Sequence, residues 1–283
     1  MIVLKRNKVA VEFIICLDSN LLFKIIYKMK GYNMCYFVNG DKSRIFLNTA
    51  IGCACKCAYC YLDGVGIKGI PIKGDVDKIV EQLLMKDYFK QGPDGTILSI
   101  GCYSECWDEE NKENTINLLK KIVVYGNYIQ LATKKSMTME EVVTINEIVT
   151  FKNQIGIYIS APTISKSREI EVGTDTIEAR LSVLEYSKMF NNIYFVLYIK
   201  PVLFGITVCD IEKYIEIIKK FSVKCVVGSM LILTNRADKD KMIGSSYFKE
   251  KQNEEEQIII DKLRKVKKVY THSCDVIEEM RKN

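Results

Sequence analysis

The sequence predicts an α/β protein in which helices cover a parallel sheet. From about residue 40 onward, apolar segments of strand length alternate with amphipathic segments of helical length. The strand-like segments are apolar at successive positions, as strands are when both faces of a parallel sheet are buried under helices. Six such units indicate a β/α barrel or part of one.

The expected strands are short and apolar. They span residues 43–50, 96–102, 128–133, 155–160, 193–201 and 225–233. Side chains able to do chemistry come where five of these strands end: cysteines after the first two, then Thr133, Ser160 and Lys200. Because the carboxyl ends of the strands meet at one face of a barrel, we expect these side chains to form one site.

The expected helices carry apolar residues at helical spacing. They span residues 75–90, 111–125, 138–151, 174–190 and 210–221. Asp75 favours a helix start, and Gly92 followed by Pro93 favours an end before strand two. Thr138 with Glu141 three positions later has the pattern of a capping box.

The length of 283 residues and the 48% of hydrophobic residues predict one compact domain. We expect residues 1–42 to form an N-terminal extension that closes the barrel bottom, 43–235 to form the core, and 236–283 to form a C-terminal extension. The polar run 235–256 is expected to be either a flap over the barrel mouth or a solvated loop.

Charge, hydropathy and cysteine content indicate which substrates and which cellular compartment suit the protein. The net charge of +6 is spread along the chain, which permits a polyanionic substrate without implying one. No segment reaches the ~18 uninterrupted apolar residues of a membrane span. The apolar N-terminus is interrupted by charges and lacks a small-residue cleavage pattern, so we do not expect a signal peptide. Eleven cysteines, an odd number in a large chain, favour free thiols and a cytoplasmic location.

Four cysteines lie within eight positions, at Cys53, Cys55, Cys57 and Cys60. Without Cys55 their spacing is x3 and x2, and three thiolates suit an iron–sulfur cubane with one iron lacking a protein thiolate. A structural zinc ion takes four ligands, so zinc stays an alternative if Cys55 or a distant cysteine joins. The only histidine, His272, is far away in the sequence. We expect Cys55 to point away from the metal.

The motif Cys-x3-Cys-x2-Cys, with Tyr59 before its last cysteine and a place after the first strand, resembles the radical S-adenosylmethionine superfamily. The resemblance implies a partial (β/α)6 barrel of the TIM type. It also implies a [4Fe-4S] cluster on Cys53, Cys57 and Cys60, with S-adenosylmethionine on the open iron. An external donor such as flavodoxin or ferredoxin would reduce the cluster, and reductive cleavage would yield a 5′-deoxyadenosyl radical that abstracts hydrogen from a substrate.

Further segments resemble the branch of this superfamily that contains spore photoproduct lyase. They are the Glu171-Val-Gly run with Arg180-Leu181 on the next helix, and the run that begins at Lys200-Pro201. Val172 stands where that branch has proline. The resemblance implies a lyase or oxidoreductase reaction in an anaerobic cytoplasm, with a nucleic-acid lesion among the candidate substrates.

The resemblance also implies residues that contact S-adenosylmethionine. They are Tyr59, Gly101, Glu105, Lys134, Ser160, Glu171 and Arg180. Three of them have a structural alternative. Glu105 would instead cap the helix that begins near Asp108, Arg180 would be a solvated residue paired with Glu178 or Glu185, and Ser160 would be an ordinary buried serine.

Cys102 and Cys106 are candidate hydrogen-atom donors, because lesion-repair members of the superfamily use a cysteine in that role. The alternative is a second cluster on these two residues and Cys274. Cys16, Cys35, Cys209 and Cys225 have apolar neighbours in the sequence, typical of cysteines that pack as small hydrophobes.

Two other kinds of function stay open at the level of the sequence. The first, within the same superfamily, is an enzyme that modifies a peptide or protein. The second, outside it, is an iron–sulfur protein for electron transfer or sensing without radical chemistry, or a zinc-binding module.

Overall fold

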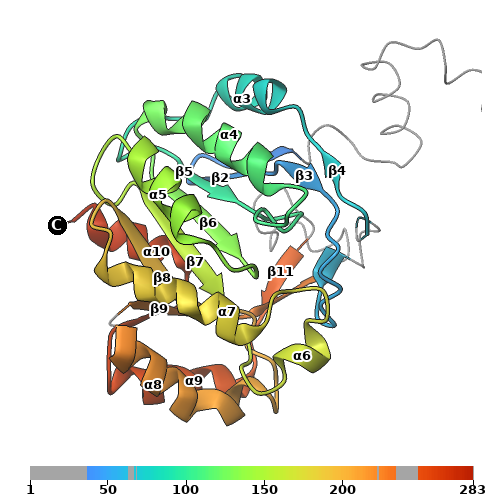
Figure 1. The fold of residues 1–283 in the computed structure, drawn as a ribbon, viewed down its shortest axis with the longest axis vertical. Coiled ribbons are helices and arrows are strands. Elements are labelled where there is room, and N and C mark those ends of the chain that lie inside the picture. The colour runs from blue at the N-terminus through green and yellow to red at the C-terminus, as the bar shows by residue number, and fades with distance from the viewer. Residues whose placement is uncertain (1–36, 63–66, 68, 222, 234–247, 283) are drawn as a thin grey trace, which may run out of the picture. The chain divides into compact units, whose positions relative to one another are not determined.

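The computed structural model describes residues 37–62, 67, 69–221, 223–233 and 248–282 (Figure 1). Residues 1–36 of the expected N-terminal extension, with Cys16 and Cys35, and most of the polar run 235–256 therefore lie outside the described residues.

The main sheet has eight strands in the order β1-β2-β5-β6-β7-β8-β9-β12. β1 is antiparallel to β2, and each of the later neighbours pairs in parallel. The strands are β1 (Val38–Gly40), β2 (Arg44–Leu47), β5 (Ile97–Ile100), β6 (Ile129–Thr133), β7 (Ile155–Ser160), β8 (Ile193–Ile199), β9 (Lys224–Val227) and β12 (Val269–Tyr270). The predicted fold class, a partial barrel of parallel strands with helices between them, is confirmed.

Helices follow the strands and cover the outside of the sheet (Figure 1). They are α3 (Val76–Leu84), α4 (Lys112–Ile122), α5 (Met139–Ile148), α6 (Ser167–Ile170), α7 (Ile177–Ser182), α8 (Ile211–Phe221), α9 (Glu254–Arg264) and α10 (Ser273–Met280). The Asp75 side chain accepts from the backbone N–H groups of Asp77 and Lys78, and Thr138 and Glu141 form the predicted capping box. Both helix starts are therefore confirmed.

Two predicted helices are shorter than expected. α3 ends at Leu84 because the chain then turns, with the N–H of Lys86 donating to the carbonyl of Leu83 at 3.1 Å. The segment 174–190 forms α7, and the tighter 3₁₀ turns of Val183–Lys188 continue it.

The predicted strand 225–233 is wrong as a single element, because it breaks at Gly228. β9 ends before this glycine, and β10 (Met230–Leu233) leaves the main sheet to pair antiparallel with β11 (Phe248–Lys251). A Cβ atom on Gly228 would lie 2.8 Å from Cδ of Lys200, so glycine lets the Lys200 side chain cross at this point.

The segment expected to form a C-terminal extension contributes β12 to the main sheet, parallel to β9. The sheet thus runs past residue 235, although the domain boundaries remain a prediction. Among the described residues, no helix has the length and apolarity needed to cross a membrane.

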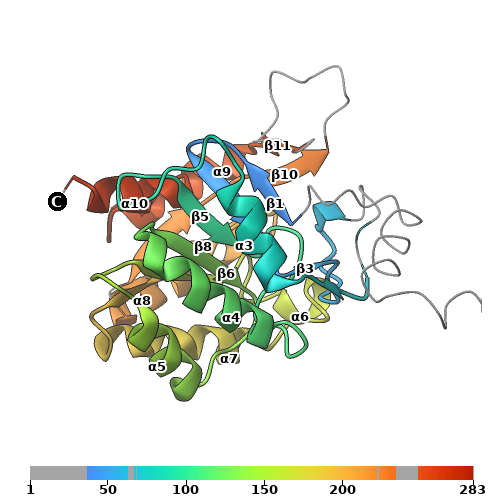
Figure 2. The same cartoon turned by 90° about the horizontal axis from the view of Figure 1, so that it is seen from above.

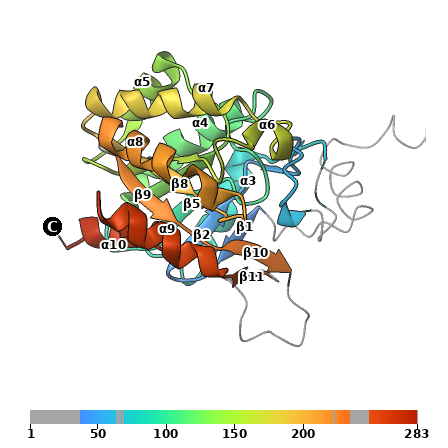
Figure 3. The same ribbon diagram turned by 90° about the horizontal axis from the view of Figure 1, so that it is seen from below.

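Two small antiparallel pairs flank the carboxyl ends of the strands. β3 (Ala50–Ile51) pairs with β4 (Ile72–Lys73) just before the cysteine loop. The β10–β11 hairpin extends from β9 toward β1 and β2 (Figures 2 and 3). Met230 and Leu231 on this hairpin line the same cavity as Arg44 and Phe46 on β2. The hairpin therefore forms part of the wall on the open side of the barrel.

Candidate functional site

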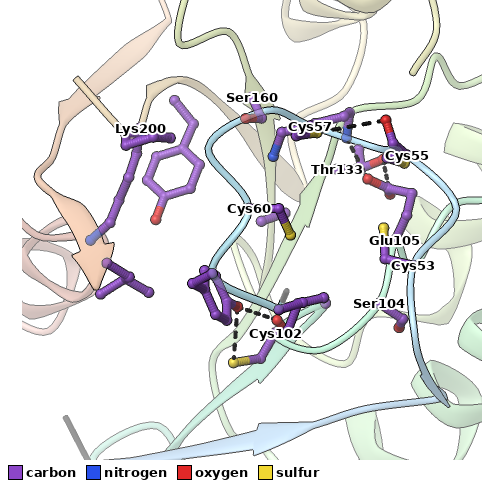
Figure 4. A pocket seen from close by; sticks show the side chains of 18 of the residues that line it. Cys53, Cys55, Cys57, Cys60, Cys102, Ser104, Glu105, Thr133, Ser160 and Lys200 are labelled. Atoms are coloured by element: carbon purple, nitrogen blue, oxygen red, sulfur yellow. Dashed lines mark hydrogen bonds between the residues drawn. The ribbon is translucent and has the colours of Figure 1, made fainter. Parts of the chain in front are cut away.

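A cavity of about 250 Å³ lies at the carboxyl ends of the strands (Figure 4). Its wall includes residues from the cysteine loop, from the ends of β5, β6, β7 and β8, and from the β10–β11 hairpin. Of the predicted site residues it includes Cys53, Cys57, Cys60, Tyr59, Gly101, Cys102, Glu105, Lys134 and Ser160. Glu171, Arg180 and Cys106 are outside this set.

The cysteine loop is held in place by backbone hydrogen bonds to both sides. The N–H of Gly69 donates to the carbonyl of Cys53 at 3.1 Å, and that of Gly173 donates to the carbonyl of Cys55 at 2.9 Å. The N–H of Ala58 donates to the carbonyl of Ile170 at 2.8 Å. Gly173 is required here, because a Cβ atom on it would lie 2.5 Å from the carbonyl oxygen of Ala54.

Cys55 does not point away from the other cysteines, contrary to our expectation. The backbone turns within the spacer, where Lys56 has a positive φ of 49°. Ala54, Lys56 and Ala58 are exposed, whereas Cys55 and Cys57 are buried and line the cavity with Cys53. The x3 spacer therefore places its central cysteine on the cavity side.

The thiols of the loop influence one another. A hydrogen bond from the Cys55 thiol lowers the pKa of Cys53 to about 7, and the same bond raises the pKa of Cys55. Burial raises the pKa of Cys57 to about 11. Cys53 therefore forms a thiolate most readily of these three.

Within the described ranges, no three His, Cys, Asp or Glu side chains converge closely enough to surround a single metal ion. Cys53, Cys57 and Cys60 are instead distributed around the mouth of the cavity, with Cys60 between the Cys53 side and the Lys200 side (Figure 4). A polynuclear cluster, in which each iron takes a different thiolate, suits such a distribution.

Glu105 is fixed by three donors next to the cysteines. Its carboxylate accepts from Oγ1 of Thr133 at 2.5 Å, from the N–H of Lys134 at 2.8 Å and from the N–H of Trp107 at 3.1 Å. Two of these donors come from the end of β6, so Glu105 ties the loop after β5 to the next strand. This is more than the helix cap considered above, since Asn111 is the N-cap of α4.

Tyr59, Glu171 and Arg180 form a buried network behind the loop. The Tyr59 hydroxyl donates to Oε1 of Glu171, and Nη2 of Arg180 lies 2.7 Å from Oε2. Arg180 is fully buried and also donates to Ser167 at 2.5 Å and to the carbonyl of Ser160 at 2.8 Å. The alternative of a solvated Arg180 paired with Glu178 or Glu185 is therefore wrong.

Ser160 and Lys134 present unused polar groups to the cavity. Among the described residues, the buried Oγ of Ser160 has no hydrogen-bond partner. Nζ of Lys134 lies 5.8 Å from the ring centroid of Tyr59. A buried hydroxyl usually has a partner, so the unpartnered Ser160 indicates that a ligand with hydrogen-bonding groups completes the site.

Cys102 and Cys106 differ in their access to the cavity. Cys102 lines it, 3.6 Å from the Tyr61 hydroxyl. Cys106 is fully buried, and its Sγ lies 3.3 Å from the carbonyl oxygen of Ala132. Burial raises the pKa of both thiols. Cys274 packs in a separate apolar cluster with Ile97, away from the residues that line the cavity.

Sequence reasoning missed most of the wall opposite the cysteine loop. Arg44 and Phe46 on β2, Ser99 on β5 and Glu250 on β11 all line the cavity. Lys200 was expected at this face, and its Nζ lies 2.6 Å from Oε1 of Glu250. The one available signal was the alternation on β2, where the partly buried Arg44 and Phe46 alternate with the buried Ile45 and Leu47.

Comparisons with known proteins reveal likeness in structure only. No protein-family model and no curated sequence matches the chain. SuiB from Streptococcus suis bound to its precursor peptide SuiA matches with a TM-score of 0.54 at 12% identity, over 93% of this chain and 55% of SuiB. SuiB without the peptide matches with a TM-score of 0.51 at 12% identity, over 81% of this chain and 49% of SuiB. The chain thus spans about half the length of SuiB.

The described part of the chain therefore shares its fold with SuiB. At 12% identity this likeness establishes the fold alone. A looser match, with a TM-score of 0.46 at 15% identity, is the radical S-adenosylmethionine methyltransferase TsrM from Kitasatospora setae. It covers 70% of this chain and 37% of TsrM. The chemistry of this chain has to be argued from its own cavity.

Proposed function

We propose that this protein is a radical S-adenosylmethionine enzyme. The observation that carries the proposal is the cysteine loop, which presents Cys53, Cys57 and Cys60 to one cavity at the carboxyl ends of the strands. That face is where barrel enzymes hold their reacting groups. The fold of the whole chain supports the same activity.

The residues around the cavity fit the two cofactors that this activity needs. Three thiols serve a [4Fe-4S] cluster and leave one iron for another ligand. The unpartnered Ser160 hydroxyl suits a ribose hydroxyl, and Lys134 suits a carboxylate. Gly101 fits a close approach of ligand to backbone, since its φ of 95° and its contact with Ala132 exclude a side chain.

When both cofactors are bound, an electron from a donor such as flavodoxin or ferredoxin would cleave S-adenosylmethionine to a 5′-deoxyadenosyl radical, which abstracts hydrogen from the substrate. The protein holds the parts in place. Glu105 fixes the start of the loop after β6 through the Lys134 N–H, and Tyr59 fixes the cysteine loop to Glu171. Neither carboxylate is free to act as a base in this arrangement.

Cys102 is the better candidate for a hydrogen-atom donor to the substrate radical. It lines the cavity, whereas Cys106 is fully buried and outside the lining. Burial raises the pKa of Cys102 and keeps the thiol protonated, which a donor of a hydrogen atom requires. In that step the S–H bond breaks, the new C–H bond forms on the substrate, and Cys102 becomes a thiyl radical.

Anaerobic reconstitution with iron and sulfide tests the proposal. We expect bound iron, and release of 5′-deoxyadenosine when the reduced protein is given S-adenosylmethionine. Reduction by dithionite and by flavodoxin would be compared in the same preparation. Iron without 5′-deoxyadenosine would leave an electron-transfer or sensor protein, and tight binding of zinc without iron would leave a zinc module; either result overturns the proposal.

A further inference from the structure

The wall opposite the cysteine loop contains a cation that the activity proposed above does not use. Arg44 on β2 lines the cavity, and its guanidinium carbon lies 4.6 Å from the ring centroid of Phe46. Lys200 lies on the same side, across the cavity from Cys53 and Cys55 (Figure 4). Cys102 lines the same cavity as Arg44.

A chain of hydrogen bonds orients Arg44 from inside the barrel. Its Nε donates to Oγ of Ser99 at 2.7 Å, and this hydroxyl donates to Oε1 of Gln130 at 3.0 Å. Nε2 of Gln130 donates in turn to the Tyr158 hydroxyl at 3.0 Å and to the carbonyl of Ser273 at 2.7 Å. Both Ser99 and Gln130 are buried. The guanidinium is therefore held by its Nε, and among the described residues no hydrogen bond or ion pair engages its two terminal nitrogens.

The carboxylates of the cavity are committed to other partners. Glu105 accepts the three hydrogen bonds described above, and Glu250 is paired with Lys200 and lies 3.5 Å from Nε2 of His272. Across the part of the chain that the structure describes, Arg44 has no carboxylate within ion-pair distance. A partly buried cation without a counter-charge is costly, so such a group usually awaits an anionic ligand.

We propose that Arg44 binds an oxyanion of the substrate, a carboxylate or a phosphate, and so selects substrates that carry one. The planar fork of a guanidinium matches both groups by two parallel hydrogen bonds. Phe46 supports the flat face of the fork, and Ser99 fixes its direction. An anion held there occupies the cavity that Cys102 also lines. This inference rests on the proposed function and adds the class of substrate to it.

Thermal unfolding of the reconstituted full chain, with S-adenosylmethionine present to fill its own site, tests the inference. Inorganic phosphate or acetate is added at an ionic strength kept constant with sodium chloride. We expect a saturable rise of the unfolding midpoint with at least one of them. A rise with phosphate would indicate a substrate that carries a phosphate, and a rise with acetate would indicate one that carries a carboxylate. Arg44→Gln is expected to weaken the apparent affinity roughly tenfold or more, as loss of hydrogen bonds to a charged group does.

Two further variants separate recognition from folding. Ser99→Ala keeps the charge of Arg44 and removes the hydrogen bond to its Nε, so anion affinity should fall less than in Arg44→Gln. If Arg44→Gln does not fold, Ser99→Ala still tests whether Arg44 binds the anion. Arg168→Gln, which removes an exposed arginine on α6, should leave the anion affinity unchanged.

Equal anion affinity in the wild type and Arg44→Gln would overturn the inference, as would the lack of any anion effect beyond that of chloride. The same titration on the protein before iron is added separates the two proposals. An anion effect without release of 5′-deoxyadenosine would remove the radical function and keep the anion site.

Discussion

The two walls of the cavity are built in different ways. On one side, backbone hydrogen bonds to residues 69 and 170–173 fix the cysteine loop, and glycines permit its close contacts. On the other side, long side chains line the cavity: Arg44 on β2, Lys200 directly after β8 and Glu250 on β11, of which the last two form an ion pair. A wall fixed by backbone suits a constant cofactor, whereas a wall of side chains changes with single substitutions and suits the choice of substrate.

The largest expected effect separates the two cysteines in the middle of the loop. Cys57→Ala should lose the iron and all release of 5′-deoxyadenosine, because a cluster ligand is removed. Cys55→Ala should keep both, although Cys55 lies on the cavity side and bonds to Cys53. Iron analysis after anaerobic reconstitution measures both variants. An iron-free Cys55→Ala protein, or an iron-loaded Cys57→Ala protein, would require a new ligand assignment.

The next effect concerns the buried ion pair behind the cysteine loop. Arg180→Met leaves the Glu171 carboxylate buried without its cation, and both side chains are fully buried. We expect the free energy of unfolding to fall by about 3–5 kcal/mol. Urea unfolding of the protein before iron is added gives this value. The double variant Glu171→Gln with Arg180→Met should be more stable than Arg180→Met alone, and the opposite order would contradict the argument.

The sequence predicted the backbone-built wall better than the other. The cysteine spacing is local, and the alternation of apolar segments was enough to place it after a barrel strand. Glu105, Lys134 and Ser160 were expected from the resemblance, and each of them lies at or after the end of a strand and lines the cavity. The position of Cys55 was missed because it depends on a backbone turn at Lys56, with a φ of 49°, that no residue type in the spacer predicts.

The opposite wall escaped prediction because its members are far apart in the chain. Arg44 lies at the start of β2, not at its carboxyl end, and reaches the cavity through the length of its side chain. Glu250 is on β11, which pairs antiparallel with β10 and not with a strand of the main sheet. No local pattern marks a contact between residues 200 and 250, so this part of the site required the structure.

A smaller effect on the cysteine side should come from Tyr59→Phe. This change removes the hydroxyl that donates to Glu171 and keeps the ring under Lys134. A hydrogen bond to a charged group contributes about 1.5–3 kcal/mol, and we expect a loss of that size in urea unfolding. Tyr186→Phe, a change on the 3₁₀ segment after α7, is the control and should lose less. Equal losses would remove the role of the Tyr59 hydroxyl in fixing the loop.

The ion pair of the opposite wall should contribute less to stability. Lys200 and Glu250 keep 18% and 26% of their side-chain surfaces exposed, so water screens their attraction. Lys200→Met is therefore expected to lower the free energy of unfolding by about 1 kcal/mol or less. A loss as large as that of Arg180→Met would show that this wall is also part of the structural framework and not an adjustable surface.

The smallest effect is a dependence of stability on pH near the cysteine loop. Burial favours a higher pKa for Asp175, but hydrogen bonds from the Ser136 hydroxyl and N–H, at 2.6 and 2.8 Å, and the charge of Lys135 outweigh it. The pKa of Asp175 is therefore lowered. Lys135 also donates to the carbonyl of Gly173 at 3.3 Å, which links this carboxylate to the segment beside the cysteines.

A lowered pKa means that the folded state prefers the charged carboxylate. Its contribution is complete above the unfolded pKa of about 3.9 and is lost as the pH falls through the lower folded value. Because Asp175 is partly exposed, we expect less than about 1 kcal/mol, measured as the difference between wild type and Asp175→Asn in urea unfolding. That difference should shrink from pH 7 to pH 3, whereas Asp94→Asn, an exposed control, should behave like the wild type at both. If the wild type instead gained stability relative to Asp175→Asn as the pH falls, the Asp175 anion would oppose folding. The segment next to the cysteines would then be held by backbone hydrogen bonds alone.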